Sequence, residues 1–480
     1  MNACFMSDSI TIATASVEHE KSYASVDAGY GRSSEWKDYE KIAFRIACIY
    51  IAFLCLPLYA DWYTYLSKLN LAELNCRDLF IISTYRTIDF VKIDTESGKW
   101  GIASYVNLAI PFAIAVVGGF VWTLLDKKTK NYNQLYYWTR VVARYRVGIG
   151  IVAWGFRKLV PGQMVWPTTG ILNTPLGDFQ AQKLYWQSVG IVPSYEIFLG
   201  AAEFTAGFLL LFRKTTALGA ALTAVVLGNI VIANHAYDGS VHVHSACYTI
   251  IALIILWHDL PNIWNLLVRE KDVLPLPYYP VITQFWLKYT RIGLITFVHV
   301  VFVALFFVLQ IDDYMHAPYR LPDTPGITDT KGAYNVTEFK LNNKIRPYDP
   351  TDSVRWQDAI FESWSTLSFK VNRTAVMDQS NGGGYSKKDV ERTWELAGIG
   401  GGRRYFYYEA DTVKHELHLF NKNDKHKNET LVLHYSRPTA TRVVLSGINE
   451  FKDSIYVVLD RVEKNYPVIE KRQQASISLP

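Results

Sequence analysis

Charged residues lie inside long apolar stretches between Tyr136 and Trp257. Arg146 and Glu203 each interrupt such a stretch, and histidines flank the last two stretches. A charge in the hydrocarbon layer costs several kcal/mol unless it is paired or hydrated, so these residues are candidates for a functional site. The sequence therefore predicts an Arg146–Glu203 ion pair between neighbouring helices, with imidazoles gathered above it. A purely structural pair that fixes helix packing is the simpler alternative.

A second polar layer is predicted nearer the non-cytoplasmic face of the membrane, where Arg157 and Lys158 end one apolar stretch. The candidate catalytic residues are Arg146, Lys158, Glu203 and His235, and the candidate substrate-binding residues are Arg157, Gln163, Asn229, Asn234, Asp238, His242 and His244. Imidazoles at this depth could shuttle protons or bind a polar or anionic ligand. The three histidines with Asp238 could also ligate a transition metal, but the His-x-His spacing matches no established metal motif, so no metal site is predicted. Solvated loop histidines are the alternative.

Seven apolar stretches approach the roughly 20 residues that cross a bilayer. They cover residues 42–60, 103–125, 136–160, 194–212, 216–236, 244–258 and 291–310. Lys and Arg concentrate before the first of them, after the second and fourth, and between the sixth and seventh. Because basic loops stay in the cytoplasm, the N-terminus is predicted to be cytoplasmic. An odd number of spans then places the C-terminal part outside the inner membrane, in the periplasm of a bacterium.

This pattern divides the chain into five parts. Residues 1–40 form a polar cytoplasmic tail, 41–130 two spans with an outer amphipathic connection, 131–265 a helical bundle, 266–311 a cytoplasmic connection with the last span, and 312–480 an outer β domain. The connection 61–101 is expected on the membrane surface. The connection 161–193 is long enough to be a lid over a ligand. From residue 333 short alternating strands predict a small antiparallel barrel or sandwich. Its interior is expected to be filled by its own side chains, with an enclosed ligand as the alternative.

Composition narrows the function classes. Half of the chain is apolar, 19% is charged, and the net charge is +5 without a basic stripe, so nucleic acid is not an expected partner. The expected partners are the lipid bilayer and a membrane or periplasmic protein. The five cysteines form no CxxC pair, which argues against a self-contained thiol redox motif.

The bundle resembles the DoxX family over residues 136–265. The likeness is carried by Arg146-Val-Gly-Ile-Gly, Gly155-Phe-Arg-Lys-Leu, Pro161, Gln163, Gly200-Ala-Ala-Glu203, the Gly207 to Gly219 segment, Asn229, Asn234, Tyr237-Asp238 and Ser245. It implies a four-helix core, and it is strongest to a branch that ends in a lipocalin-like domain. DoxX relatives include subunits linked to thiosulfate and quinone oxidation. This chain has no cysteine pair, haem-attachment motif or flavin fingerprint, which argues against electron transfer by this chain alone.

Three functions follow as hypotheses. The first is a quinone- or small-molecule-linked oxidoreductase that uses the polar site of the bundle, with quinone as the implied cofactor. The second is a non-catalytic membrane scaffold or accessory subunit that binds a partner through its outer β domain. The third rests on a distant resemblance to the membrane domain of the vitamin K-dependent carboxylase and makes Lys158 a catalytic base. A packed bundle interior would argue against the first, and an exposed Lys158 against the third.

Overall fold

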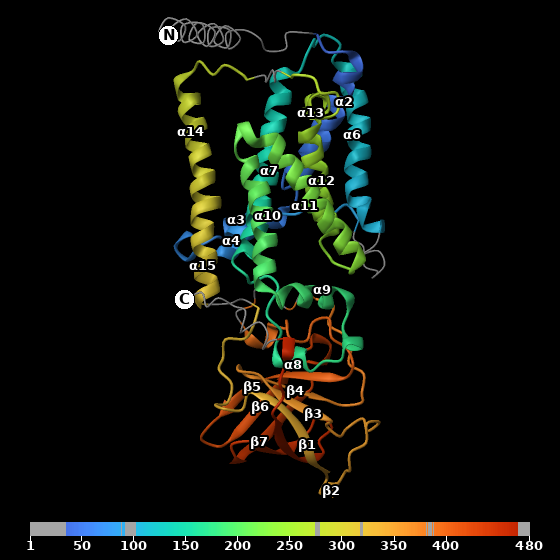
Figure 1. The fold of residues 1–480 in the computed structure, drawn as a ribbon, viewed down its shortest axis with the longest axis vertical. Coiled ribbons are helices and arrows are strands. Elements are labelled where there is room, and N and C mark those ends of the chain that lie inside the picture. Colours follow the sequence, from blue (N-terminus) through green and yellow to red (C-terminus); the bar gives the residue numbers. More distant parts are fainter. Residues whose placement is uncertain are drawn as a thin grey trace, which may run out of the picture.

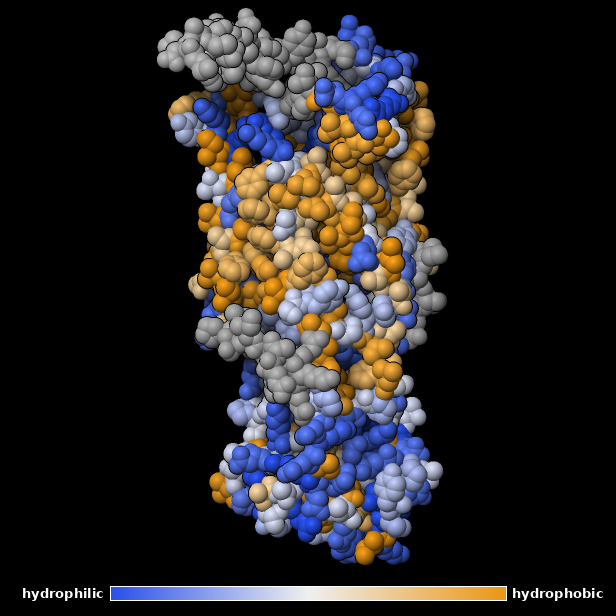
Figure 2. Space-filling view, in the orientation of Figure 1, coloured by the Kyte–Doolittle hydropathy of each residue, from blue (hydrophilic) through white to orange (hydrophobic). Residues whose placement is uncertain are grey.

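The computed structural model describes residues 35–468 apart from 88, 92–101, 274–278, 317–319, 381, 383–385 and 387. Most of the predicted tail, residues 1–34, and part of the 61–101 connection therefore lie outside the described residues. The molecule is elongated, with a helical bundle at one end and a β domain at the other (Figure 1). On the visible face the surface of the bundle is broadly apolar and that of the β domain is mostly polar (Figure 2).

Helices occupy all seven of the ranges expected to cross the membrane. They are α2 (Asp38–Cys55), α6 (Val106–Leu125), α7 (Asn133–Leu159), α10 (Pro193–Leu210), α11 (Thr216–Ala236), α12 (His242–Trp257) and the continuous stretch of α14 (Phe285–His299), the π-helical η5 (Val300–Leu305) and α15 (Phe306–His316). Three of the helical stretches in the described part of the chain, Ala103–Leu125, Arg213–Ala236 and Phe285–His316, are long and apolar enough to cross a membrane. Two bent pairs, α2 with α3 (Ala60–Ser67) at 46° and α12 with α13 (Leu260–Leu267) at 67°, would raise this number to five.

Helices α7 and α10 pack closely because glycines line their contact. A Cβ atom built on Gly200 would lie 2.3 Å from the backbone nitrogen of Leu159, and one on Gly155 would lie 2.6 Å from that of Phe204. Small residues let two helix backbones approach in this way. The contact sets the register of the antiparallel pair, in which Gly200 rather than Pro193 is level with the end of α7.

The outer connection after α2 does not simply lie on the membrane surface as expected. Helix α3 remains on the flank of the bundle, whereas α4 (Cys76–Ser83) packs among α7 and α15. Cys76 and Leu79 are buried there against Phe156 and Phe306. The expectation of a surface-lying segment is therefore wrong for α4, because its apolar side chains find a partner inside the bundle.

The β domain is a closed antiparallel barrel, as predicted. Its strands are β1 (Gly332–Leu341), β3 (Asp358–Phe361), β4 (Thr366–Lys370), β5 (Arg403–Asp411), β6 (Glu416–Asn421), β7 (Thr430–Thr439), β8 (Arg442–Ile448) and β9 (Ser454–Val462), with β2 (Lys344–Ile345) as a short hairpin arm on β1. Pairing of β9 with β1 closes the barrel. Its interior is packed with apolar side chains, among them Phe339, Phe361 and Phe369. The barrel is thus filled by its own core.

Candidate functional site

The central polar contact of the bundle is an ion pair between Lys158 and Glu203. The Lys158 ammonium lies 2.9 Å from both carboxylate oxygens of Glu203, and both side chains are buried. Lys158 is in the last turn of α7, and Glu203 faces it from the adjoining turn of α10. The ring of Trp154, one turn earlier on α7, has its centroid 5.7 Å from the same ammonium. The pair satisfies two charges that would each be costly alone in this environment.

The predicted ion pair between Arg146 and Glu203 is wrong. Arg146 precedes Lys158 by 12 residues on α7, which is about 18 Å along a helix at 1.5 Å per residue. The prediction assumed that α7 ends and α10 begins at one level. The close contact of Gly200 with Leu159 shows that α10 begins about two turns beyond the end of α7, so Glu203 lies level with the end of α7.

Arg146 instead holds the end of helix α4 inside the bundle. Its guanidinium donates to the carbonyl oxygens of Ser83 at 3.0 Å and Tyr85 at 2.5 Å, and to the hydroxyl of Tyr248 at 2.5 Å. It also lies over the Tyr85 ring at 3.7 Å and the Tyr248 ring at 4.8 Å. A cation is favourable at a helix C-terminus because the carbonyl groups there have no helical partner. A structural role accounts for every one of these contacts.

The three histidines do not form one cluster. The rings of His235 and His242 lie 4.8 Å apart, with Tyr105 bonded to His235 at 2.8 Å. The imidazole of His242 is bonded on both sides, with Nδ1 donating to the Gly239 carbonyl at 3.0 Å and Nε2 2.6 Å from the Ser104 hydroxyl. His244 turns inward, where its ring lies 4.6 Å from that of Tyr248. Its buried Nε2 atom has no hydrogen-bond partner in the described structure.

Four other candidates lie apart from the Lys158–Glu203 pair. Asn229 is exposed on α11, away from the bundle interior. Asn234 shapes the turn between α11 and α12 by bonding Ile230 and Val241, and Asp238 is an exposed residue of that turn with φ of 52°. Arg157 is buried with its guanidinium 5.1 Å from the Phe80 ring, toward α4. The expectation that these four residues would share one substrate site is not met.

Gln163 is buried close to the ion pair, together with two residues that the sequence analysis missed. Glu196 accepts from the backbone nitrogens of Gln163 at 3.1 Å and Met164 at 2.9 Å. Gln187 is buried in α9 (Ala181–Gly190), whose last residue packs on the Met164 and Val165 carbonyls. The side-chain oxygen of Gln163 and both polar atoms of the Gln187 amide have no partner in the described structure. Glu196 stands only three residues after Pro193 at a helix start, a position more often solvated, so sequence offered little signal for it.

The 161–193 connection is not a free lid, because it is bonded to the β domain. Backbone nitrogens of Thr169 and Gly170, at the start of the short helix α8 (Thr169–Leu172), donate to the Glu362 carboxylate at 3.1 and 2.7 Å. A strand-like bridge joins Phe179 to Ile399 through two backbone hydrogen bonds of 2.9 and 2.7 Å. The predicted lid is therefore a connector between the two halves of the molecule (Figure 1).

Buried charges continue this connection into the barrel. Lys183 of α9 donates to the Trp394 carbonyl at 2.5 Å and lies 3.7 Å above the Trp394 ring. Burial lowers the pKa of Lys183 well below its ordinary value of 10.5, and the nearby Arg320 lowers it further. The neighbouring Glu395 is fully buried and accepts from Lys422 at 2.6 Å. Trp394 and Glu395 lie in a stretch without regular periodicity, and Lys183 and Lys422 come from distant parts of the chain, so sequence alone did not indicate the contact.

Comparison with known proteins places the chain in a family. It is 32% identical over 127 residues to YwoB of Bacillus subtilis, described as uncharacterized, and the matched part is 26% of this chain and 80% of YwoB. This chain belongs to the YwoB family. No family model matches it, and no solved structure matches it. Because YwoB is described as uncharacterized, this relationship assigns no activity. The chemistry of the site is therefore inferred from its geometry.

The geometry of the Lys158–Glu203 pair favours a structural role for these charged residues over a catalytic one. Both oxygens of Glu203 contact the Lys158 ammonium, so the lysine nitrogen is engaged in an ion pair rather than free to contact a substrate. Among the described residues no group of three or more His, Cys, Asp or Glu side chains is arranged to hold a metal ion. The polar residues of the bundle are placed to lock helices together, with unpartnered amide groups remaining at Gln163 and Gln187.

Proposed function

We propose that this chain is a non-catalytic membrane scaffold that holds its β barrel rigidly outside the membrane for a partner protein. The observation that carries the proposal is the set of contacts between the 161–193 segment and the barrel domain. Main-chain hydrogen bonds beside Phe179 and Ile399 and the Glu362 contact with α8 join the two. Lys183 adds a hydrogen bond to the Trp394 carbonyl next to that bridge. Such a joint positions a domain, whereas a lid over a substrate needs freedom to open.

The packing of the molecule supports a scaffold over the two enzymatic hypotheses. In the described part of the bundle, buried apolar side chains pack around Val147, Ile151 and Leu210, and this packing argues against a quinone site between those helices. The ion pair with Glu203 engages the Lys158 nitrogen, which disfavours its use as a carboxylase base. Lys158 is nevertheless buried rather than exposed, so the exposure criterion does not by itself exclude that hypothesis.

A surface for a partner is available at the end of the barrel farthest from the bundle. The β2 hairpin and the turn between β8 and β9 meet there, since the Asn342 backbone nitrogen donates to the Ser454 carbonyl at 2.8 Å. The exposed apolar side chains of this tip are Ile345, Tyr348, Ile448 and Phe451. Neighbouring exposed apolar side chains are typical of protein contacts. We assign partner binding to this tip.

The membrane setting belongs to the same proposal. All seven helical ranges would cross the inner membrane, with the N-terminus in the cytoplasm and the barrel in the periplasm. Helices α7 and α10 are less apolar than the three helices named above, but Lys158 and Glu203 pair with each other and Arg146 is bonded to the end of α4 inside the bundle. Placed this way, the DoxX-like features form the core of a membrane anchor for the barrel.

The proposal is tested by photo-crosslinking in native membranes. A photoreactive amino acid at Ile345 or Phe451 is expected to yield a discrete crosslinked protein, whereas one at the exposed Val225 of α11 should capture lipid. Replacing Ile345 and Phe451 by Ser should abolish co-purification of the partner without lowering the melting temperature. A lipophilic small molecule released stoichiometrically from purified protein, and lost in Glu203→Gln, would contradict the proposal.

A further inference from the structure

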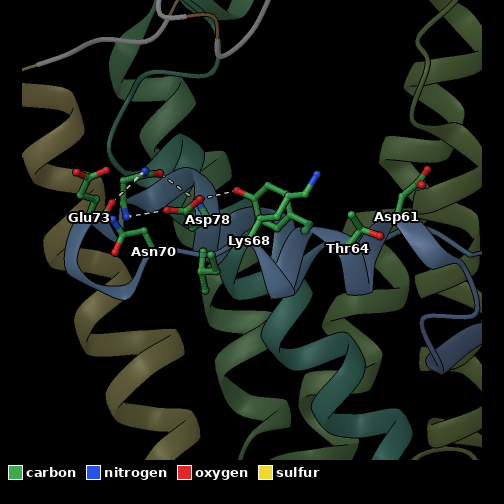
Figure 3. A pocket seen from close by; sticks show the side chains of 9 residues that line it. Asp61, Thr64, Lys68, Asn70, Glu73 and Asp78 are labelled. Atoms are coloured by element: carbon green, nitrogen blue, oxygen red, sulfur yellow. Dashed lines mark hydrogen bonds between the residues drawn. The ribbon is translucent and has the colours of Figure 1, made fainter.

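A cleft of about 450 Å³ opens on the flank of the bundle, apart from the sites described above. Its walls are α3, the 3₁₀ turn η1 (Leu71–Glu73) and the first turn of α4. The polar lining includes Asp61, Thr64, Lys68, Asn70, Glu73 and Asp78 (Figure 3). This volume is in the range of small-molecule sites, which is roughly 300–1,000 Å³.

The floor of the cleft is rigidly built. Asn75 and Asp78 cap the start of α4 reciprocally, with backbone-to-side-chain hydrogen bonds of 3.2 and 3.0 Å. The hydroxyl of Tyr65 on α3 donates to the Asp78 carboxylate at 2.5 Å and thereby ties the two helices together. The carboxylate of Asp78 is consequently occupied, and it serves the shape of the cleft rather than a ligand.

Three other charged side chains in the cleft have no such engagement. Asp61, Lys68 and Glu73 make no side-chain hydrogen bond or ion pair within the part of the chain that the structure describes. Asp61 and Lys68 are seven residues apart and lie on one side of α3. In Figure 3 all three side chains rise on the same side of the ribbon, with the Lys68 ammonium between the two carboxylates. The cleft therefore offers one positive and two negative groups at separate positions.

The cleft lies on the side of the bundle that leads toward the β domain. Figure 1 shows α3 and α4 crossing the bundle near the end of α15 that continues into that domain. Exposed Tyr63 and Leu71 border this segment. Aromatic side chains are enriched where the hydrocarbon layer meets water, so the position fits the outer headgroup region.

We propose that this cleft binds a membrane lipid whose headgroup carries a primary ammonium beside a phosphate, as in phosphatidylethanolamine. Lys68 would contact the phosphate as a point charge, and Asp61 or Glu73 would accept from the ammonium. A quaternary ammonium lacks N–H donors and forfeits those bonds. An anionic headgroup without an amine can still reach Lys68, but it offers no N–H donor to the two carboxylates and is repelled by them. The inference rests on the membrane placement proposed above but does not depend on the scaffold role.

Lipid retention by the full-length protein tests this assignment. Protein in detergent is equilibrated with vesicles of phosphatidylethanolamine, phosphatidylcholine or phosphatidylglycerol, and retained lipid is counted by native mass spectrometry. We expect phosphatidylethanolamine to be retained at least five-fold more than either other lipid. The double variant Asp61→Asn/Glu73→Gln should remove this preference, while Asp89→Asn, an exposed residue of the same connection, should keep it. None of these side chains supports the fold, so the variants should remain folded.

Two outcomes would overturn the proposal. Equal retention of the three lipids by the unmodified protein would show that the protein does not distinguish their headgroups. Retention unchanged in the double variant would place any selectivity elsewhere. Water-soluble phosphoethanolamine serves as the comparison for the source of the ligand. If it competes with the lipid at equal concentration, the assignment to a membrane lipid fails, because the acyl chains would then contribute nothing.

Discussion

At the scale of single residues, the Lys158–Glu203 pair offers the sharpest measurement. Glu203→Gln removes one charge and leaves the Lys158 ammonium buried without a counter-ion. Breaking a buried pair in this way costs about 3–5 kcal/mol. We expect a correspondingly lower free energy of unfolding for the variant, measured by denaturant titration in mild detergent with tryptophan fluorescence.

The double variant Lys158→Met/Glu203→Leu is the matched control for that prediction. Replacing a buried pair by apolar residues is often neutral or stabilising, so most of the lost stability should return. An unstable double variant would show that the pair contributes more than mutual neutralisation. A stable double variant that still binds its partner would exclude chemistry at the pair.

Residue types were easier to predict from the sequence than their partners. That Arg146 and Glu203 are buried in the bundle follows from their position in apolar stretches, and the structure agrees; Lys158, expected at a helix end near the outer surface, is buried as well. Their pairing depends on the offset between α7 and α10, which the close approach at Gly200 sets and which no periodicity reveals. The carbonyl groups that Arg146 binds belong to α4, a segment expected outside the bundle.

At the scale of elements, the packing of α7 against α10 depends on Gly200. A methyl group there would meet the Leu159 backbone at 2.3 Å, and a helix backbone cannot yield without moving the whole contact. Gly200→Ala should therefore destabilise the protein by at least about 1–3 kcal/mol, the usual cost of overpacking. Gly228→Ala is the control, because nothing lies within 4 Å of its added Cβ. That change should be neutral or slightly stabilising, and equal melting temperatures for the two variants would contradict the described contact.

The contact between Glu362 and α8 should respond to pH. Burial raises the pKa of Glu362 above its ordinary value of 4.5, although backbone N–H groups partly offset the shift. The folded protein then takes up this proton at a higher pH than the unfolded chain does. The contribution of Glu362 to stability therefore grows as pH falls toward 4.5 and shrinks as pH rises through the folded pKa.

Melting temperatures between about pH 5 and pH 8 test this linkage. Glu362→Gln cannot titrate, so its melting temperature should change less with pH than that of the unmodified protein. It should also be less stable at every pH by about 1–3 kcal/mol, since one backbone N–H of α8 loses its acceptor. Glu409→Gln, at an exposed position of β5, should leave the pH slope unchanged. An identical slope in Glu362→Gln would remove Glu362 as the titrating group.

The positions of the helices and strands along the chain were largely predictable, but their packing partners in the fold were not. Apolar runs located every long helix, and alternation located the barrel strands β1 and β4 to β9 but not the short strand β3. The 161–193 connection was recognised as unusually long, but its bonds to Ile399 and Glu362 cross more than 190 residues of chain. No local pattern encodes a contact over that separation.

At the scale of the whole molecule, the barrel and the bundle are joined by several independent contacts. The Phe179–Ile399 bridge, the Glu362 contact and the Lys183–Trp394 contact all lie at the same boundary. Sequence predicted the two parts and their order along the chain. It gave no sign of this boundary, because the residues that form it come from short or irregular segments that are far apart in the chain.

The proposed orientation in the membrane makes a final prediction about accessibility. Lys414 lies in an exposed turn of the barrel, and Lys128 lies in the connection between α6 and α7 at the opposite end of the molecule. The four described cysteines are free and three are buried, so a cysteine added to a Cys4→Ser/Cys48→Ser background should dominate labelling. With the barrel in the periplasm, Lys414→Cys should react with a membrane-impermeant maleimide in cells whose outer barrier has been opened. Lys128→Cys should react only after the inner membrane is dissolved. The reverse labelling pattern would show the opposite orientation in the membrane. The proposed partner surface and lipid cleft would then lie on the cytoplasmic side.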